Sequence, residues 1–179
     1  MASILAFAGS NSSTSINFEL VRCTVALVEG HTVQLKDMSQ YTFPMYRADD
    51  ERMKGYPEGM AEFMADIRSA DGLILSVNEH NGNPSAYFKN LMDWLSRMDR
   101  KFMEATKVLL MSTSGGKRGG MGSREVVLNL LPRFGAEVVS SFSLPSFREN
   151  FGDGEILDPD LKVEHQKAIE AFLESLTQH

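Results

Sequence analysis

Apolar residues along the chain alternate between short runs and longer stretches with helical spacing. Four of the short runs are nearly continuous, as in strands buried on both faces of a sheet, and the second run alternates with polar residues. The five predicted strands span Ser3–Ala8, His31–Leu35, Gly72–Val77, Lys107–Met111 and Val138–Leu144.

Between these runs, apolar residues recur at intervals of three and four, which places them on one face of a helix. Gly30 and Gly135 stand where helices commonly end. The predicted helices cover Ile16–Val28, Met60–Ile67, Phe88–Leu95, Arg124–Phe134 and Ile169–Leu176.

Regular alternation of strands and helices predicts one α/β domain over residues 1–179. Repeated strand–helix units imply a parallel sheet with helices on both faces. Two sheet layouts are common for five such strands. In the flavodoxin-like order, 2-1-3-4-5, ligands bind at the carboxyl ends of the strands, near the switch point between strands one and three. The loops at that edge are Gly9–Ser15, Asn78–Asn83 and Ser112–Gly122.

Composition narrows the classes of partner. The net charge of −6 argues against nucleic acid, because phosphate binding needs a basic surface. Cys23 is the only cysteine, which excludes a disulfide within the chain and favours a reducing compartment. The first residues form a strand pattern rather than a signal peptide, and no apolar run approaches the roughly 20 residues of a membrane helix. We expect a soluble, cytoplasmic protein with no membrane partner.

Metal binding is not expected either. The four histidines, His31, His80, His165 and His179, are scattered without the spacing of a metal site.

The first loop follows Gly9 with six consecutive hydroxyl or amide side chains, Ser10–Ser15, immediately before a helix. A helix N-terminus offers free N–H groups and a positive dipole end, and hydroxyls add uncharged donors. This combination suits a terminal phosphate monoester. It does not suit a pyrophosphate, because neither G-x-G-x-x-G nor a P-loop is present. An ordinary serine-rich helix cap fits the same residues.

The other two loops have backbone-rich patterns. Asn81-Gly82 marks a turn with positive φ, whose fixed amides can hydrogen-bond a planar heterocycle; a plain strand-to-helix connection is the alternative. Five glycines within Ser112–Gly122 allow a ligand to lie on the backbone. Lys117 and Arg118 there suit a phosphate of a nicotinamide cofactor, although a mobile surface loop with solvated charges fits equally.

Two motifs together resemble a known family. Glu79–Gly82 (EHNG), followed by Lys89–Trp94 (KNLMDW), resembles the E-Y-N-G…K-N-A-x-D-W signature of NAD(P)H-dependent FMN reductases, and the spacing between the two parts is the same. This flavodoxin-like family includes quinone, azo-dye and chromate reductases. Three further segments are similar to the family's phosphate loop, second glycine loop and ending: Gly9–Asn17, Ser114–Gly120 and Phe151–Leu161.

The resemblance implies a flavodoxin-like three-layer sandwich that transfers a hydride from NADPH or NADH to FMN and then passes electrons to a small acceptor, such as free flavin or a quinone. Because the cofactor carries this chemistry, we expect no catalytic nucleophile. The family generally forms homodimers or homotetramers. The implied FMN contacts are Ser10, Ser15, Ile16, Asn17, Asn78, Glu79, His80, Asn81, Gly82, Ser112, Ser114, Gly115 and Gly116.

The chain departs from the family pattern at three places that bear on flavin affinity and substrate access. Many relatives carry an arginine in the first loop, where this chain has Asn11 and Ser12. Asn78 replaces the usual proline before the glutamate, and Ser85-Ala86 replaces a Pro-Gly pair.

Two other functions were weighed. A non-catalytic electron carrier of the flavodoxin type would share the flavin site. An SGNH-type esterase would use Ser10 as nucleophile and His165 as base, but the aspartate of that motif is missing.

The long connection Lys36–Pro57 is expected to cap a neighbouring active site in the oligomer.

Overall fold

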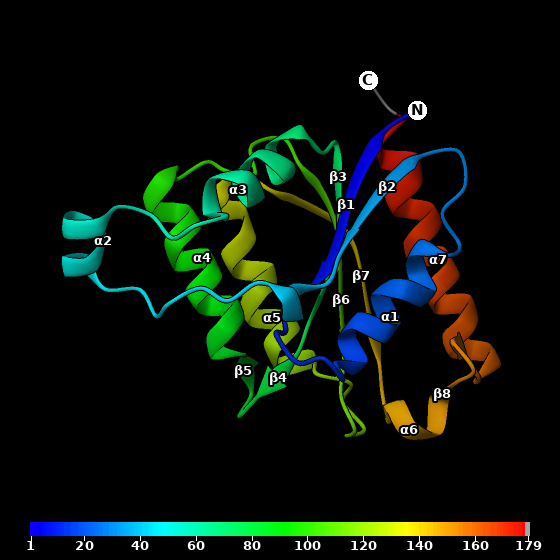
Figure 1. The fold of residues 1–179 in the computed structure, drawn as a ribbon. Coiled ribbons are helices and arrows are strands. Elements are labelled where there is room, and N and C mark those ends of the chain that lie inside the picture. The colour runs from blue at the N-terminus through cyan, green and yellow to red at the C-terminus, as the bar shows by residue number, and fades with distance from the viewer. Residues whose placement is uncertain (178–179) are drawn as a thin grey trace.

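A five-stranded parallel sheet in the order β2-β1-β3-β6-β7 forms the middle layer of the computed structural model, which describes residues 1–177 (Figure 1). Each neighbouring pair of strands is parallel. Numbered along the sheet's own strands, this order is 2-1-3-4-5, which confirms the flavodoxin-like prediction. His179 lies outside the described residues. The five strands are β1 (Ser3–Ala8), β2 (Thr32–Lys36), β3 (Gly72–Val77), β6 (Lys107–Thr113) and β7 (Glu137–Leu144).

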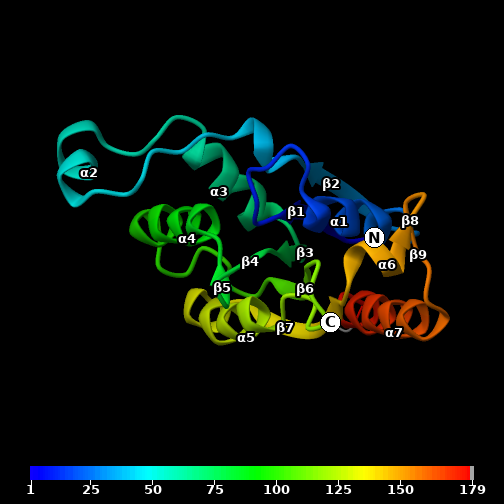
Figure 2. The same cartoon turned by 90° about the horizontal axis from the view of Figure 1, so that it is seen from below.

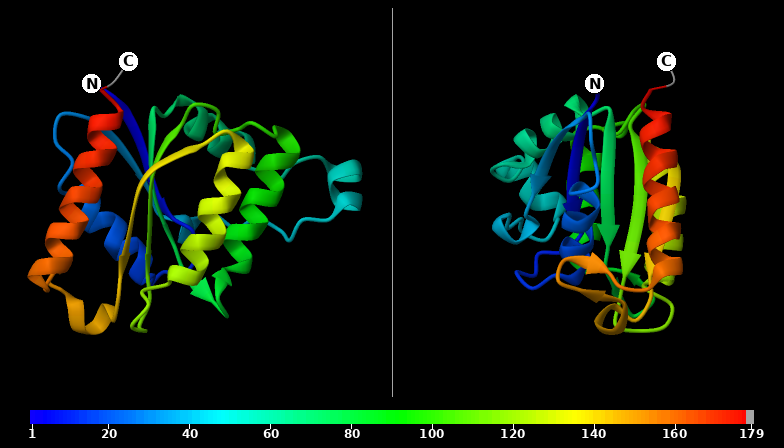
Figure 3. Two further views of the ribbon diagram at one scale, coloured as in Figure 1. Left: turned by 180° about the vertical axis from the view of Figure 1, so that it is seen from behind. Right: turned by 90° about the vertical axis from the view of Figure 1, so that its right-hand side faces the viewer.

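Helices cover both faces of this sheet (Figure 3). One face carries α1 and α7, and the other carries α3, α4 and α5. Their bounds are α1 (Ile16–Val25), α3 (Met60–Ser69), α4 (Ala86–Met98), α5 (Met121–Leu130) and α7 (Pro159–Ser175).

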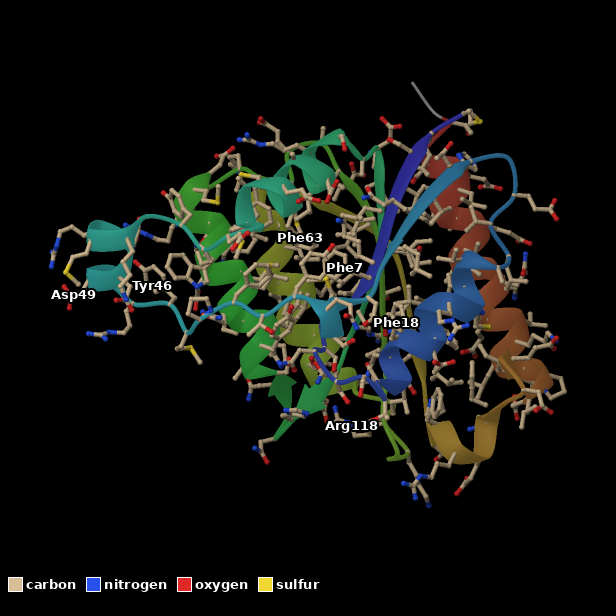
Figure 4. All side chains as sticks on the ribbon, in the orientation of Figure 1. Phe7, Phe18, Tyr46, Asp49, Phe63 and Arg118 are labelled. Carbon is tan, nitrogen blue, oxygen red and sulfur yellow. The ribbon has the colours of Figure 1, made fainter. Side chains whose placement is uncertain are left out.

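Strand β1 shows why the apolar runs belong in the middle of the sheet. Leu5 and Phe7 point into the core beneath α3, α4 and α5, whereas Ile4 and Ala6 point into the core beneath α1 and α7. All four are at most 1% exposed. Phe7 meets Phe63 of α3 edge to face, with ring centroids 5.2 Å apart (Figure 4). Burying one such large side chain contributes roughly 1.5–3 kcal/mol, so the alternation holds a helical layer on each side.

Several short elements were not predicted. They are α2 (Ala48–Lys54), α6 (Phe147–Asn150) and two small hairpins, β4 (Glu79–His80) with β5 (Asn83–Pro84) and β8 (Phe151–Gly152) with β9 (Glu155–Ile156).

The bounds of several predicted helices also differ, most of all at α7, which begins at Pro159 rather than Ile169. Helix α1 ends at Val25 rather than Val28. Helix α5 covers Met121–Leu130 rather than Arg124–Phe134, and its last predicted turn is a 3-10 turn around Pro132, which cannot continue the α-helical hydrogen bonding.

The segment Lys36–Pro57 is an arm that carries α2 away from the body (Figures 1 and 2). None of the seven residues of α2 is buried. Before α2, the arm is fastened to α4: Asn90 Nδ2 and Trp94 Nε1 donate to Pro44 O at 3.0 and 2.8 Å, and the N–H of Tyr46 donates to Asn90 Oδ1 at 2.7 Å. The Tyr46 ring packs edge-on against Trp94. The arm therefore has a fixed base and an exposed tip, where Asp49 lies (Figure 4).

Across the part of the chain that the structure describes, none of the helices has the length and apolar character needed to cross a bilayer.

Candidate functional site

Three loops meet at the carboxyl ends of β1, β3 and β6, at the lower end of the sheet in Figure 1. Gly9 fastens the start of the first loop to β3 and to the N-terminus of α4. Its N–H donates to Ser76 O at 2.8 Å, and its carbonyl accepts from Ser85 Oγ at 2.9 Å. A Cβ on Gly9 would lie 2.6 Å from the ring of Phe88, so a side chain here would push the first loop away from α4.

The first loop presents hydroxyl protons next to a helix N-terminus. Ser15 caps α1 by accepting from the N–H of Phe18 at 3.2 Å, and Ser10 Oγ accepts from the N–H of Ser12 at 3.3 Å. Because each of these oxygens acts as an acceptor, its own O–H remains available to donate. The N–H of Ile16, in the first turn of α1, has no carbonyl one helical turn earlier to accept it. The loop can therefore receive an anion without a basic side chain.

The side chain of Asn17 is bonded within the protein. It is 2% exposed, and its side chain joins α1 to two strands. Its Nδ2 donates to Thr113 O at 3.1 Å, and its Oδ1 accepts from Thr113 N at 3.0 Å and from Ser76 Oγ at 2.7 Å. The structure thus puts this side chain beneath the first loop, where it holds the ends of β3 and β6 together.

The second loop is the hairpin β4–β5. Asn81 and Gly82 have φ angles of 55° and 74°, so the predicted positive-φ turn is confirmed. No atom lies within 4 Å of an ideal Cβ on Gly82, which leaves the turn open on that side. The exposed His80 has its Nε2 3.4 Å from Asn78 Nδ2. Asn78 Oδ1 is buried and has no hydrogen-bond partner among residues 1–177.

The side chain of Glu79 is directed at α5 and is hydrogen-bonded there. Its Oε2 accepts from the N–H of Ser123 at 3.0 Å. The hydroxyl of the fully buried Ser123 donates in turn to Asn78 O at 2.8 Å. The hairpin is therefore bonded to the helix that follows the third loop.

The third loop, Ser112–Gly122, has one fixed end and one open end. Ser112 is fully buried and donates to Gly119 O at 2.8 Å. Gly119 has a φ of 57°, and a Cβ there would lie 2.7 Å from the carbonyl of Leu144, so this end lies tightly against β7. At the open end, an ideal Cβ on Gly115 meets no atom within 4 Å.

Polar groups at this open end are exposed. Ser114 Oγ accepts from the N–H of Gly116 at 3.2 Å. Lys117 and Arg118 are exposed, and neither forms an ion pair within the described residues (Arg118 is labelled in Figure 4).

The structure therefore separates the predicted contacts by exposure and bonding. Eight are exposed or partly exposed at one edge: Ile16, Asn78, His80, Asn81, Gly82, Ser114, Gly115 and Gly116. Ser10 and Ser15 are buried, at 7% and 8% exposure, and each hydroxyl oxygen accepts a backbone N–H. The side chains of Asn17, Glu79 and Ser112 are bonded within the protein.

Ser76, Thr113 and Ser123, which hold these loops, were missed by the sequence analysis. The first two carry a signal that could have found them, because each is a polar residue near the carboxyl end of an otherwise apolar strand.

His165 lies in helix α7, where it does not hold any of the three loops. It is 1% exposed, its Nε2 lies 2.9 Å from Thr24 Oγ1, and its ring packs near Phe142. Burial lowers the pKa of His165 to about 4. A buried, neutral imidazole bonded to a threonine of α1 gives no support to the esterase interpretation.

Comparison with known proteins places these features in context. A family model described as NADPH-dependent FMN reductase matches residues 2–149. The chain is 26% identical over 176 residues to an NAD(P)H-dependent FMN reductase of Pseudomonas aeruginosa, covering 94% of this chain and 92% of that protein. It is 31% identical over 121 residues to an NADPH:quinone oxidoreductase of Arabidopsis thaliana, covering 65% and 60%.

Among solved structures, the fold is similar to that of the flavoenzyme FerB, an NAD(P)H:(acceptor) oxidoreductase of Paracoccus denitrificans. The TM-score is 0.72 at 19% identity, covering 97% of this chain and 98% of that one.

Proposed function

Because the chain belongs to the NADPH-dependent FMN reductase family, we propose that it binds FMN across the three loops and uses it to pass electrons from NAD(P)H to a small acceptor. Family membership makes the protein an oxidoreductase that depends on FMN and on a nicotinamide cofactor. The assignment of individual residues and of the acceptor is our proposal.

The single observation that carries the site is the set of donors at the first loop. Ser10 and Ser15 keep their hydroxyl protons, and Ile16 offers a backbone N–H at the positive end of α1. Three uncharged donors within one short loop fit the phosphate of FMN. No arginine is needed for this geometry, which accounts for a first loop with Asn11 and Ser12 where many relatives have a basic residue.

The flavin ring fits between the second and third loops. Gly82 and Gly115 both border open space, and a side chain at either position would occupy it. The backbone groups of Asn81, Gly82 and Gly116 are the polar contacts that such a ring would use. Asn78 Oδ1, an acceptor without a partner in the described chain, is the one buried side-chain atom here that awaits a donor.

When bound, FMN supplies hydride acceptance from NAD(P)H and electron delivery to the acceptor. The residues of this chain bind and orient it and need not act as nucleophile or base. We assign Lys117 and Arg118, exposed beside the glycine loop, to a phosphate of the nicotinamide cofactor. Replacement of His80 by Gln is expected to leave hydride transfer intact, and a loss of transfer with FMN still bound would contradict this assignment.

The acceptor that we propose is a quinone or a free flavin. Support comes from the printed names of the relatives, which include an FMN reductase and an NADPH:quinone oxidoreductase.

We further propose that the chain forms a homodimer or homotetramer in which the arm Lys36–Pro57 covers the site of another copy. The arm exposes large apolar side chains: Met45, Met53 and Tyr56 are 63%, 69% and 44% exposed. Molar mass from light scattering, compared between wild type and a Met45→Ser/Met53→Ser double variant, tests this. A wild-type monomer would contradict it.

The function itself is tested by titrating the protein with FMN and then NADPH without oxygen while recording the visible spectrum. Rapid, protein-dependent bleaching of the flavin band is expected, followed by recovery when a quinone is added. A bound flavin that stays oxidised would mean an electron carrier, and no binding of FMN would mean that the chain shares only the fold. Riboflavin, which lacks the phosphate, is the matched control and should bind more weakly.

A further inference from the structure

Helix α5 begins without a cap of its own. Its N-cap residue is Gly120, in the left-handed conformation with a φ of 75°, so no side chain is present to accept from the first turn. The first N–H groups of a helix have no partner within the helix. In most helices, a Ser, Thr, Asp or Asn at the N-cap accepts from the second or third N–H.

Glu79 takes the place of this missing cap from a distant part of the chain. Ser123 is the third residue of α5, and its N–H donates to Glu79 Oε2 at 3.0 Å across a sequence separation of 44. The carboxylate thereby lies at the positive end of the helix dipole, where negative charge is favoured. Ser123 adds a second bond through its hydroxyl, which donates to Asn78 O at 2.8 Å.

Gly122 makes room for this contact. An ideal Cβ on Gly122 would lie 2.8 Å from Glu79 Oε2 and 3.2 Å from Gly82 O. Its φ lies outside the left-handed region, so any amino acid could adopt its backbone conformation. The glycine is therefore required by the approach of the carboxylate and of the hairpin turn.

These contacts join the two loops on either side of the proposed flavin ring. The hairpin follows β3, whereas the glycine loop follows β6 and runs directly into α5. In the described residues the side-chain bonds from the hairpin segment to α5 are those of Ser123 with Asn78 and Glu79. Without them, the turn at Asn81-Gly82 would lose its fixed position relative to the glycine loop.

We propose that Glu79 is a positioning residue, which caps α5 and so sets the separation of the two loops that hold FMN. This inference rests on the proposed function and changes the role of Glu79 from a contact of the cofactor to a support of the residues around it. Together, Glu79, Ser123 and Gly122 form a clasp between the hairpin and α5.

The test compares Glu79→Ala and Glu79→Gln with Asp158→Ala. Asp158 caps α7 by accepting from the N–H of Leu161 at 2.9 Å, so its loss removes a helix cap elsewhere in the fold. The readouts are the FMN dissociation constant from quenching of flavin fluorescence and the melting temperature of the FMN-free protein. Glu79→Ala and Asp158→Ala should lower the melting temperature by similar amounts.

Of these two variants, Glu79→Ala but not Asp158→Ala should weaken FMN binding, by about tenfold, equal to about 1.4 kcal/mol. In Glu79→Gln, the amide oxygen still accepts from Ser123, so most of the affinity should return. Gly122→Ala, which keeps Glu79 but displaces its carboxylate, should behave like Glu79→Ala. Wild-type affinity in both Glu79→Ala and Gly122→Ala, or equal loss in Asp158→Ala, would overturn the proposal.

Failure of the proposed function is distinguishable from failure of the clasp. If the wild-type protein binds no FMN, the function fails, and amide hydrogen exchange in the FMN-free protein decides the capping role. The N–H of Ser123 should then exchange faster in Glu79→Ala and at the wild-type rate in Asp158→Ala. Unchanged exchange of Ser123 in Glu79→Ala would overturn the clasp itself.

Discussion

At the scale of single residues, a few polar side chains in an apolar framework fix the shape of the site. Asn17 makes three hydrogen bonds, to both backbone groups of Thr113 and to Ser76, at a position that is 2% exposed. An amide can do this because it carries donors and an acceptor on one planar group. A carboxylate, which can only accept, could not donate to the carbonyl of Thr113.

Replacement of Asn17 by Ala is therefore expected to destabilise the protein by roughly 2–3 kcal/mol, since buried groups of Thr113 and Ser76 lose their partners. Urea unfolding of the FMN-free protein measures the loss. Asn129→Ala is the control, because Asn129 donates only to Glu125 O on the exposed side of α5. Equal stabilities of the two variants would contradict the role assigned to Asn17.

His165 predicts a dependence of stability on pH. Its pKa is lowered by burial from 6.5 to about 4, so the unfolded chain binds a proton more readily than the folded one between these values. The free energy of unfolding therefore has its full value above pH 6.5. As the pH drops toward 4, it falls by about 3 kcal/mol from this group alone.

In the variant His165→Gln, the free energy of unfolding should lose this part of its dependence on pH. Unfolding free energies measured from pH 4 to 7 test the prediction, and His80→Gln, at an exposed position, should keep the wild-type slope. An unchanged slope in His165→Gln would mean that other groups govern the acid sensitivity.

At the scale of elements, the arm illustrates how few contacts can hold a projecting segment. Asn90 accepts from the N–H of Tyr46 and donates to Pro44 O, so one side chain bonds to two points of the arm. Asn90→Ala is expected to speed tryptic cleavage after Arg52 or Lys54 in α2, because the arm loses part of its fixed base.

Mass spectrometry of the fragments over time measures that effect. Asn129→Ala, on the exposed side of α5 away from the arm, is the control and should be cut at the wild-type rate. Equal rates for both variants would show that Trp94 and the packing of Tyr46 hold the arm without Asn90.

Elements also mark how far the sequence could be interpreted. The strands and main helices were predictable because each carries its own apolar run or stripe, and the carboxyl ends of the strands located the three loops. Helix α2 was not predictable, since none of its seven residues is buried and they show no apolar pattern. The true start of α5 was also missed, because its cap is Glu79 rather than a neighbouring residue.

The same distinction applies to the candidate site. A positive φ at Asn81 and Gly82 follows from local chemistry and was predicted from the dipeptide. The inward bonding of Asn17 and Glu79 depends on partners far away in the chain, which no local pattern indicates.

At the scale of the whole molecule, ligand binding and folding are linked. A ligand that binds only the folded state at about 100 times its dissociation constant stabilises that state by about 2.7 kcal/mol. For a chain of this size, we expect saturating FMN to raise the melting temperature by roughly 5–10 °C.

Thermal denaturation with and without FMN tests this expectation, with riboflavin at the same concentration as the control. At equal concentration riboflavin should give a smaller shift, since it cannot use the donors of Ser10 and Ser15. Equal shifts for both compounds would place the phosphate outside the first loop.

The attachment of the arm to Trp94 has a practical consequence. Trp94 is the only tryptophan in the chain, is 1% exposed, and donates its indole N–H to Pro44 O in the arm. Release of the arm would bring water to the indole and shift its emission to longer wavelength. The protein thus carries an intrinsic fluorophore where the arm is attached to α4. Release and return of the arm can therefore be followed in real time without a chemical label.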